Sequence, residues 1–208
     1  MADPIFVHLD GIGKKYKHWI FRNINYQFQT GVVGIGGGNG SGKSTLIKII
    51  SGFLTPTEGN VKFRSALSGP LERDQWAASV SYSGPDIELI QELTLDEHVR
   101  FHVKFKEMGF EIDIGTFFDI TELSKFRNLR VGELSSGLKQ RFELGLAILS
   151  ASKVLLLDEP TSYLDRSSRG WFVENFKIYA RERTVIIASN DMEDLSLCDS
   201  ILQVEDYK

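Results

Sequence analysis

The 208 residues carry 28 acidic and 24 basic side chains, a formal net charge of −4, and 42% of them are hydrophobic. This is an ordinary globular composition, with enough residues for one substantial core. The acidic balance argues against a broad nucleic-acid-binding surface, and a single cysteine excludes an intrachain disulfide. No apolar run approaches the roughly 18 residues of a membrane span, and the segment 1–4 lacks the layout of a signal peptide.

The first 50 residues predict two strands, then a strand, a glycine loop and a helix. Ile5, Val7 and Leu9 alternate as in a half-buried strand, and a second apolar pattern covers 21–28. A β-branched run at 32–35 leads into a glycine-rich segment, and apolar residues follow it at helical spacing.

The glycine-rich segment matches the phosphate-binding loop pattern of a glycine, four residues and Gly-Lys-Ser. Glycines let the backbone curl so that its N–H groups surround a phosphate. Lys43 can reach the β- and γ-phosphates of a triphosphate, and the Ser44 hydroxyl can bind Mg²⁺. The residues predicted to bind the phosphates are Gly37, Gly38, Asn39, Gly40, Ser41, Gly42, Lys43, Ser44 and Thr45.

The middle of the chain changes character. Short apolar runs near 61–63 and 80–82 are typical of strands, and residues 93–126 then become rich in phenylalanine and charge with helical periodicity. Thr94 and Glu97 have the spacing of a capping box. This pattern indicates a helical lobe inserted into an α/β core.

Two acidic residues follow a buried strand in the last third of the chain. After a helical stripe at 138–149, a continuous apolar run at 154–157 ends in Asp158 and Glu159, and a similar run occupies 184–188. Ligands of open α/β sheets bind at the carboxyl ends of the strands. We therefore expect Asp158 to hold Mg²⁺ and Glu159 to polarise the water that attacks the γ-phosphate.

The segment Leu134-Ser135-Ser136-Gly137 completes a pattern that resembles the nucleotide-binding domain of the ATP-binding cassette (ABC) family over nearly the whole chain. The resemblance implies an α/β P-loop NTPase core with a mostly parallel sheet, an N-terminal antiparallel β subdomain and an inserted helical subdomain. It further implies a single domain over 1–208, with 1–84 and 146–208 as the core and 85–145 as the helical subdomain.

The resemblance assigns roles to residues on a second face of the nucleotide. Ser135, Ser136 and Gly137 would grip the ATP held by the phosphate loop of a facing second cassette; Ser135 or Ser136 can also simply cap a helix beginning near Gly137. Ser136 and Leu138 replace a glycine and the glutamine of the family consensus. Asp165 would lie in a turn across the dimer interface, or in a plain turn.

The sequence allows more than one role at three further positions. Tyr16 sits where the family places an aromatic that stacks on adenine, although Trp19 is a rival and an ordinary strand-end aromatic is a third reading. Pro85 occupies the usual position of a glutamine, so that Asp86 either reaches the metal or is a solvated loop acid. Asn190 replaces a histidine that contacts the γ-phosphate; it cannot carry charge, and with Glu193 it also has the spacing of a helix cap.

These patterns predict a Mg²⁺-dependent ATPase subunit of an ABC transporter, similar to bacterial exporters. It would dimerise around two ATP molecules with an identical or paralogous cassette and drive a separate membrane permease. We expect it in the cytoplasm, peripheral on the inner face of the cell membrane, with no nucleic-acid partner. The alternatives are a soluble ABC-type ATPase and an ATP-gated dimerisation module whose hydrolysis is weak because of Pro85 and Asn190.

Overall fold

The structure is a computed structural model that describes residues 3–109, 112–180 and 182–208. The chain forms two compact units. The first, here called the sheet unit, contains the chain up to Tyr82 together with Lys153–Glu159 and Glu182–Lys208. The second, here called the helical unit, contains Ser83–Ser152 and Pro160–Arg181.

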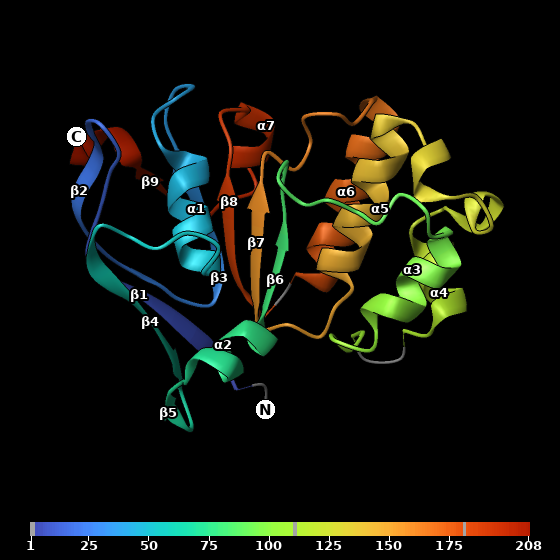
Figure 1. The fold of residues 1–208 in the computed structure, drawn as a ribbon, viewed down its shortest axis with the longest axis horizontal. Coiled ribbons are helices and arrows are strands. Elements are labelled where there is room, and N and C mark those ends of the chain that lie inside the picture. Colours follow the sequence, from blue (N-terminus) through green and yellow to red (C-terminus); the bar gives the residue numbers. More distant parts are fainter. Residues whose placement is uncertain (1–2, 110–111, 181) are drawn as a thin grey trace. The chain divides into compact units, whose positions relative to one another are not determined.

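A five-stranded sheet with the strand order β6-β7-β8-β3-β9 forms the centre of the sheet unit (Figure 1). Strand β8 pairs in parallel with β7 and β3, and β3 pairs in parallel with β9. The predicted continuous apolar runs are the two fully buried strands β7 and β8, which confirms a sheet covered on both faces. The bounds are β3 Gly31–Gly36, β6 Val80–Ser83, β7 Val154–Asp158, β8 Thr184–Ala188 and β9 Ser200–Gln203.

An antiparallel sheet with the order β2-β1-β4-β5 makes up the rest of the β structure. Val7 of β1 lies opposite Phe28 of β2 and Phe63 of β4, and all three side chains are buried. The predicted alternation of β1 is therefore confirmed, because one face of this sheet packs on the core. The bounds are β1 Ile5–Lys15, β2 Trp19–Phe28, β4 Glu58–Ser65 and β5 Gly69–Pro70.

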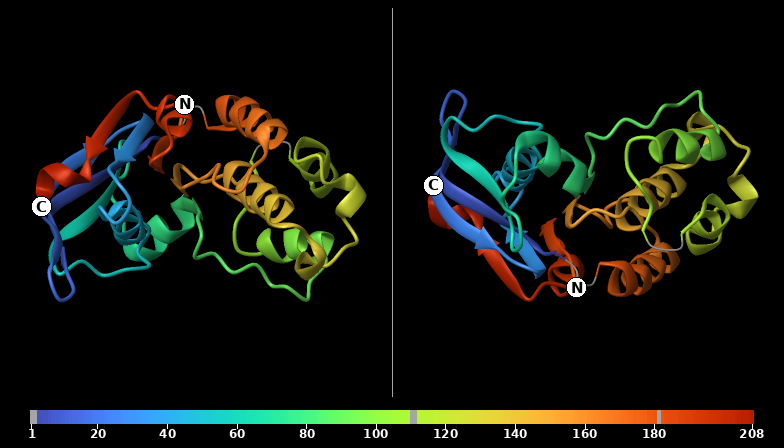
Figure 2. Two further views of the ribbon diagram at one scale, coloured as in Figure 1. Left: turned by 90° about the horizontal axis from the view of Figure 1, so that it is seen from above. Right: turned by 90° about the horizontal axis from the view of Figure 1, so that it is seen from below.

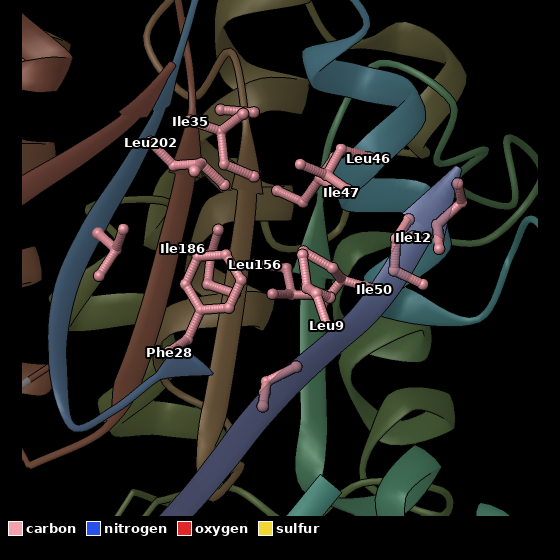
Figure 3. Packing of buried hydrophobic residues seen from close by; sticks show 14 of the residues in the cluster. Leu9, Ile12, Phe28, Ile35, Leu46, Ile47, Ile50, Leu156, Ile186 and Leu202 are labelled. Atoms are coloured by element: carbon pink, nitrogen blue, oxygen red, sulfur yellow. The ribbon is translucent and has the colours of Figure 1, made fainter. Parts of the chain in front are cut away.

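Helix α1 (Lys43–Ser51) fills the space between the two sheets. Its apolar side chains mix with those of both sheets, as Figure 3 shows for Leu9, Ile12, Leu46, Ile47, Ile50, Leu156 and Ile186. This packing fixes the helix that follows the phosphate loop. The sheet unit also contains α2 (Arg73–Ser79), α7 (Met192–Leu195) and the 3₁₀ turn η3 (Val204–Tyr207).

The helical unit is built around α5 (Ser136–Ile148), which lies between α6 (Arg166–Tyr179) and α3 (Leu95–His102) in both views of Figure 2. Phe142 of α5 packs edge-on against His98 and Phe117, so three helices share one apolar core. The predicted capping box is confirmed: Glu97 N–H donates to Thr94 Oγ1, and Thr94 N–H donates to the Glu97 carboxylate. The remaining elements are α4 (Ile114–Ile120), η1 (Ser124–Phe126) and η2 (Val131–Glu133).

The division into units differs from the subdomain boundaries expected from the sequence. Helix α6 belongs to the helical unit, whereas the sequence pattern groups 146–208 with the core. The cause is a set of contacts that sequence order does not reveal: Trp171 Nε1–H donates to the carbonyl of Ile120 at 2.7 Å, and Arg141 donates to Ser168 Oγ at 3.0 Å. A single domain over 1–208 stays a prediction. None of the helices in the described ranges is long and apolar enough to cross a membrane.

Candidate functional site

The phosphate loop connects the end of β3 to the start of α1. Gly37, Gly40 and Gly42 have φ angles of +143°, +74° and +109°, a backbone region that favours glycine. A Cβ on Gly37 would lie 2.5 Å from Ser41 Oγ, and one on Gly42 would lie 2.6 Å from Ile20 Cγ2. Both glycines are therefore required by conformation and by space, as the loop pattern predicts.

Lys43 is the first residue of α1, and its side chain turns back over the loop. Its Nζ donates to the carbonyls of Gly37 at 3.0 Å and Gly38 at 3.2 Å, and only 5% of the residue is exposed. The same Nζ lies 3.9 Å from Glu159 Oε1. The lysine therefore holds a positive charge at the mouth of the loop, next to the carboxylate after β7.

Ser44 and Asp158 meet across the same site. The Ser44 hydroxyl donates to Asp158 Oδ1 at 3.0 Å, which joins α1 to the carboxyl end of β7. A hydroxyl and a carboxylate are the oxygen donors that Mg²⁺ prefers, and this ion usually takes one or two carboxylates together with substrate phosphates. The described residues contain no cluster of three or more His, Cys, Asp or Glu suited to a metal. The Ser44–Asp158 pair nevertheless fits Mg²⁺ bound together with a phosphate.

Glu159 has an unusual backbone for its residue type. Its φ is +50°. A left-handed backbone costs a non-glycine residue about 1–3 kcal/mol, and residues in this conformation are concentrated at functional sites. Glu159 N–H donates to the Ala188 carbonyl of β8 at 2.8 Å. Its Oε2 lies 3.2 Å from the Ser189 hydroxyl, whose single proton has a closer acceptor in Asp194 Oδ2 at 2.8 Å. The backbone of Glu159 is thus fixed by the neighbouring strand, and its carboxylate faces Lys43. Ser189 was not predicted as a neighbour of this carboxylate, because a lone serine after a strand gives no signal for such a position.

Asn190 makes a contact that the sequence did not predict. Its Nδ2–H donates to Asn39 Oδ1 in the phosphate loop at 2.6 Å. The predicted cap formed by Asn190 with Glu193 is wrong, because α7 begins at Met192 and its N-cap is Asp191, whose carboxylate accepts from Glu193 N–H at 2.8 Å. The asparagine side chain is therefore available to the loop. Whether it also serves the γ-phosphate stays a prediction.

The two candidate adenine-stacking aromatics have different surroundings. Tyr16 follows β1, is 60% exposed, and has the Lys14 ammonium 5.1 Å from its ring centroid. Trp19 is more buried, with the Arg22 guanidinium carbon 4.2 Å and the Lys15 ammonium 5.5 Å from its ring. Each ring therefore has a cation beside it, and the greater exposure of Tyr16 favours Tyr16 as the stacking platform. The stacking role stays a prediction.

The helical unit carries the other predicted nucleotide-binding residues. Ser135 is the N-cap of α5, with its Oγ accepting from Leu138 N–H at 3.4 Å, whereas Ser136 is already the first helical residue. A Cβ on Gly137 would lie 3.3 Å from the Tyr163 carbonyl, so the loop before α6 closely approaches the segment 134–138, here called the signature. Asp165 caps α6, and the hydrogen bond from Ser168 N–H lowers its pKa.

Glu143 of α5 is a buried carboxylate to which the sequence analysis gave no role. Its Oε1 accepts from Ser83 Oγ at 2.6 Å and from Gly84 N–H at 2.7 Å, and burial raises its pKa. These bonds anchor the beginning of the loop that carries Pro85 and Asp86, both of which are exposed. The helix that starts at the signature is therefore tied to the loop of the predicted metal-reaching Asp86.

Replacing Glu143 should loosen this loop and destabilise the helical unit. Glu143→Ala leaves two buried donors without an acceptor, at an expected cost of about 1–3 kcal/mol in the free energy of unfolding measured with urea. Glu143→Gln keeps an acceptor oxygen and should cost less. Because the folded pKa is raised, the stabilisation by the carboxyl group is complete below its unfolded pKa and is lost as pH rises through the folded pKa. The difference in unfolding free energy between the parent and Glu143→Gln should therefore shrink as pH rises. A urea midpoint of Glu143→Ala equal to that of the parent would contradict the role of Glu143 as an anchor.

The predicted residues thus form two constellations, one in each unit. The sheet unit brings together the phosphate loop, Asp158, Glu159 and Asn190, and the helical unit brings the signature serines near the loop of Asp165. A glycine loop between a buried parallel strand and a helix, with a Lys–Glu pair and a Ser–Asp pair at the strand ends, defines a P-loop nucleoside triphosphatase.

Comparison with known proteins gives the family. The profile of the ABC transporter family matches residues 21–162. The uncharacterized ABC transporter ATP-binding protein YybJ of Bacillus subtilis is 32% identical over 193 residues, which cover 90% of this chain and 87% of YybJ. The cytochrome c biogenesis ATP-binding export protein CcmA of Brucella abortus is 32% identical over 178 residues, or 85% of this chain and 80% of CcmA.

Solved structures share the fold. The cassette MJ0796, solved as a dimer in a post-hydrolysis state with ADP and phosphate, matches with a TM-score of 0.79 at 24% identity, covering 96% of this chain and 94% of that one. A putative ABC transporter ATP-binding protein of Pyrococcus furiosus matches with a TM-score of 0.79 at 21% identity over 98% and 99% of the two chains. The chain belongs to the ABC transporter family, and within it to the ATP-binding subunits, which hydrolyse ATP.

Proposed function

We propose that this chain is one of a pair of ABC subunits that close around two Mg²⁺-bound ATP molecules and drive a separate membrane-spanning partner. The observation that carries the proposal is the cluster of Lys43, Ser44, Asp158 and Glu159 around the phosphate loop. The names of the relatives, an ABC transporter ATP-binding protein and an ATP-binding export protein, support a transporter of the exporter type.

The residues of the sheet unit have distinct roles in this proposal. The loop N–H groups and Lys43 bind the β- and γ-phosphates. Glu159, whose carboxylate lies beside the Ser189 hydroxyl and faces Lys43, orients and polarises the attacking water and accepts its proton. Ser44 and Asp158 would hold Mg²⁺, which would neutralise part of the phosphate charge when it is bound.

The residues of the helical unit serve the second cassette. The Ser135 hydroxyl and the N-terminal N–H groups of α5 form an anion-binding end, where helix dipole and free donors act together. Ser136 and Gly137 complete the grip on the partner's γ-phosphate. The dimeric structures of MJ0796 support an arrangement of two cassettes, and an identical or a paralogous partner satisfies it equally.

Exposed aromatics suggest where the membrane partner binds. Phe101 and Phe105 of the helical unit are 42% and 74% exposed, with ring centroids 5.0 Å apart. Phe117 and Phe118 are buried and belong to the core instead. The exposed pair is available to a docking segment of a permease, which would hold the chain at the cytoplasmic face of the membrane.

A second candidate, an ATP-gated dimerisation module with weak hydrolysis, is favoured by one observation. Asn190 occupies the position of the expected histidine and is engaged with Asn39, and an amide neither carries charge nor shuttles a proton. Under either proposal we expect ATP binding to be retained and turnover to be slower than in relatives with a histidine.

Phosphate release and light scattering of the purified chain test the proposal. We expect ATP-dependent phosphate release that requires Mg²⁺, and a shift from monomer to dimer with ATP that reverses as ATP is consumed. Dimerisation by ATP without phosphate release would favour the second candidate. A chain that stays monomeric with ATP, and that copurifies with ribosomes or DNA rather than with a multispanning membrane protein, would contradict both and indicate a soluble ABC ATPase.

A further inference from the structure

The carboxyl-terminal segment of the sheet unit contacts the phosphate loop. Strand β9 pairs in parallel with β3, and the pairing ends at Gly36 and Gln203. Two positions further along each segment are Gly38 and Glu205. Gly38 N–H donates to Glu205 Oε1 at 3.0 Å. The parallel register thus places a carboxylate against the beginning of the loop.

The residues on both sides of Glu205 are anchored in the core. Val204 is fully buried, and Tyr207 packs against the same hydrophobic cluster. Glu205 lies between them in the turn η3 and is exposed. A Cβ on Gly38 would lie 3.3 Å from Glu205 Oε1, so the carboxylate and the loop are in close contact. The packing of its neighbours therefore sets the position of Glu205 beside the loop.

One peptide unit of the loop, between Gly37 and Gly38, is hydrogen-bonded through both of its polar groups. Its carbonyl belongs to Gly37 and accepts from Lys43 Nζ at 3.0 Å. Its N–H belongs to Gly38 and donates to Glu205. Because the C=O and N–H of a trans peptide point in opposite directions, Lys43 and Glu205 lie on opposite sides of this unit. The carboxylate therefore does not compete with a phosphate for Lys43.

This peptide unit is one that needs a restraint. Gly37 has a φ of +143°, and glycine adopts positive φ about as readily as negative φ. Since neither Gly37 nor Gly38 has a side chain, the unit between them has more freedom to rotate than other residue pairs would allow. Rotation would turn the Gly37 carbonyl away from Lys43 Nζ. An acceptor for Gly38 N–H on the outer side of the loop opposes that rotation, and Glu205 supplies it.

We infer that Glu205 is a positioning residue for nucleotide binding. Its carboxylate fixes the peptide between Gly37 and Gly38, which keeps the Gly37 carbonyl directed at Lys43 and the loop preformed for phosphate. The inference rests on the proposed function in one respect, that this loop binds the phosphates of ATP. It also fixes the sign of an experiment. Removing a negative charge near a triphosphate should strengthen binding by Coulomb's law, whereas losing this hydrogen bond should weaken it.

Isothermal titration of the full chain with Mg²⁺ and the non-hydrolysable ATP analogue AMP-PNP tests the inference. Glu205→Ala should raise the Kd by about three- to tenfold, the range expected for the loss of one hydrogen bond. Glu205→Gln keeps an acceptor oxygen and should raise the Kd less. The matched control Asp206→Ala removes the same charge from the next exposed residue of η3, and its Kd should equal or lie below that of the parent.

Further measurements separate positioning from a loss of structure. Because Glu205 is exposed, the thermal midpoint of Glu205→Ala should match the parent, while the Gly38 amide should exchange faster with solvent by NMR. Phosphate release should show a raised KM with kcat retained, since bound ATP itself orders the loop. A Kd of Glu205→Ala equal to or below that of the parent would overturn the inference and leave the proposed function intact. Undiminished binding by Lys43→Met would instead contradict the proposed phosphate site.

Discussion

Glu159→Gln should lower steady-state phosphate release by about 10²- to 10⁴-fold while leaving ATP binding intact, since that range is the typical contribution of a general base. The amide is nearly isosteric and keeps an oxygen beside the Ser189 hydroxyl. It cannot take a proton from the attacking water. With ATP and Mg²⁺ the variant should accumulate as a dimer, which light scattering would detect.

The positive φ of Glu159 sets a condition on this experiment. Glutamine must adopt the same left-handed backbone, so the thermal midpoint of the variant should be compared with the parent. Glu92→Gln, an exposed glutamate of the helical unit, is the matched control and should hydrolyse ATP at the parent rate. Parent-rate turnover by Glu159→Gln itself would remove Glu159 as the base.

Lys43→Met should weaken ATP binding by about 100-fold or more. The ammonium already faces the loop carbonyls and the Glu159 carboxylate, so its reach over the phosphate site is set by the fold. Hydrogen bonds to charged groups are worth about 1.5–3 kcal/mol each, and losing two of them accounts for this factor. Isothermal titration with ATP and Mg²⁺ measures the change.

Methionine suits the position because Lys43 is buried and its aliphatic stem is retained in shape. Lys177→Met, on the exposed face of α6, removes the same charge away from the loop and should bind ATP like the parent. A Kd of Lys43→Met within a factor of about two of the parent, with the fold intact, would place the phosphates somewhere other than this loop.

Local patterns predicted the elements well, because each element was specified by its own residues. The glycines of the phosphate loop, the buried runs of β7 and β8, and the box at Thr94 all depend on spacing within a few residues. The family resemblance, now shown, added the fold and the activity.

Contacts between distant segments could not be predicted in this way. The acceptor for Ser83 and Gly84 is Glu143, some 60 positions away, and α6 joins the helical unit through Trp171 and Ile120. The cap of α7 was misassigned by one residue, because Asn190 and Asp191 are both good N-cap residues and only the helix start decides between them. The left-handed backbone of Glu159 has no sequence signal at all, since its residue type does not favour it.

The close approach of Gly42 to Ile20 and Phe21 has a consequence for how this chain can vary. The turn predicted to bind triphosphate rests directly on side chains of β2, a strand of the antiparallel sheet. We therefore expect mutations that enlarge or shrink these two side chains to alter nucleotide affinity through the loop. As a result, we expect substitutions in β2 to be limited by phosphate binding as well as by the packing of its side chains in the core.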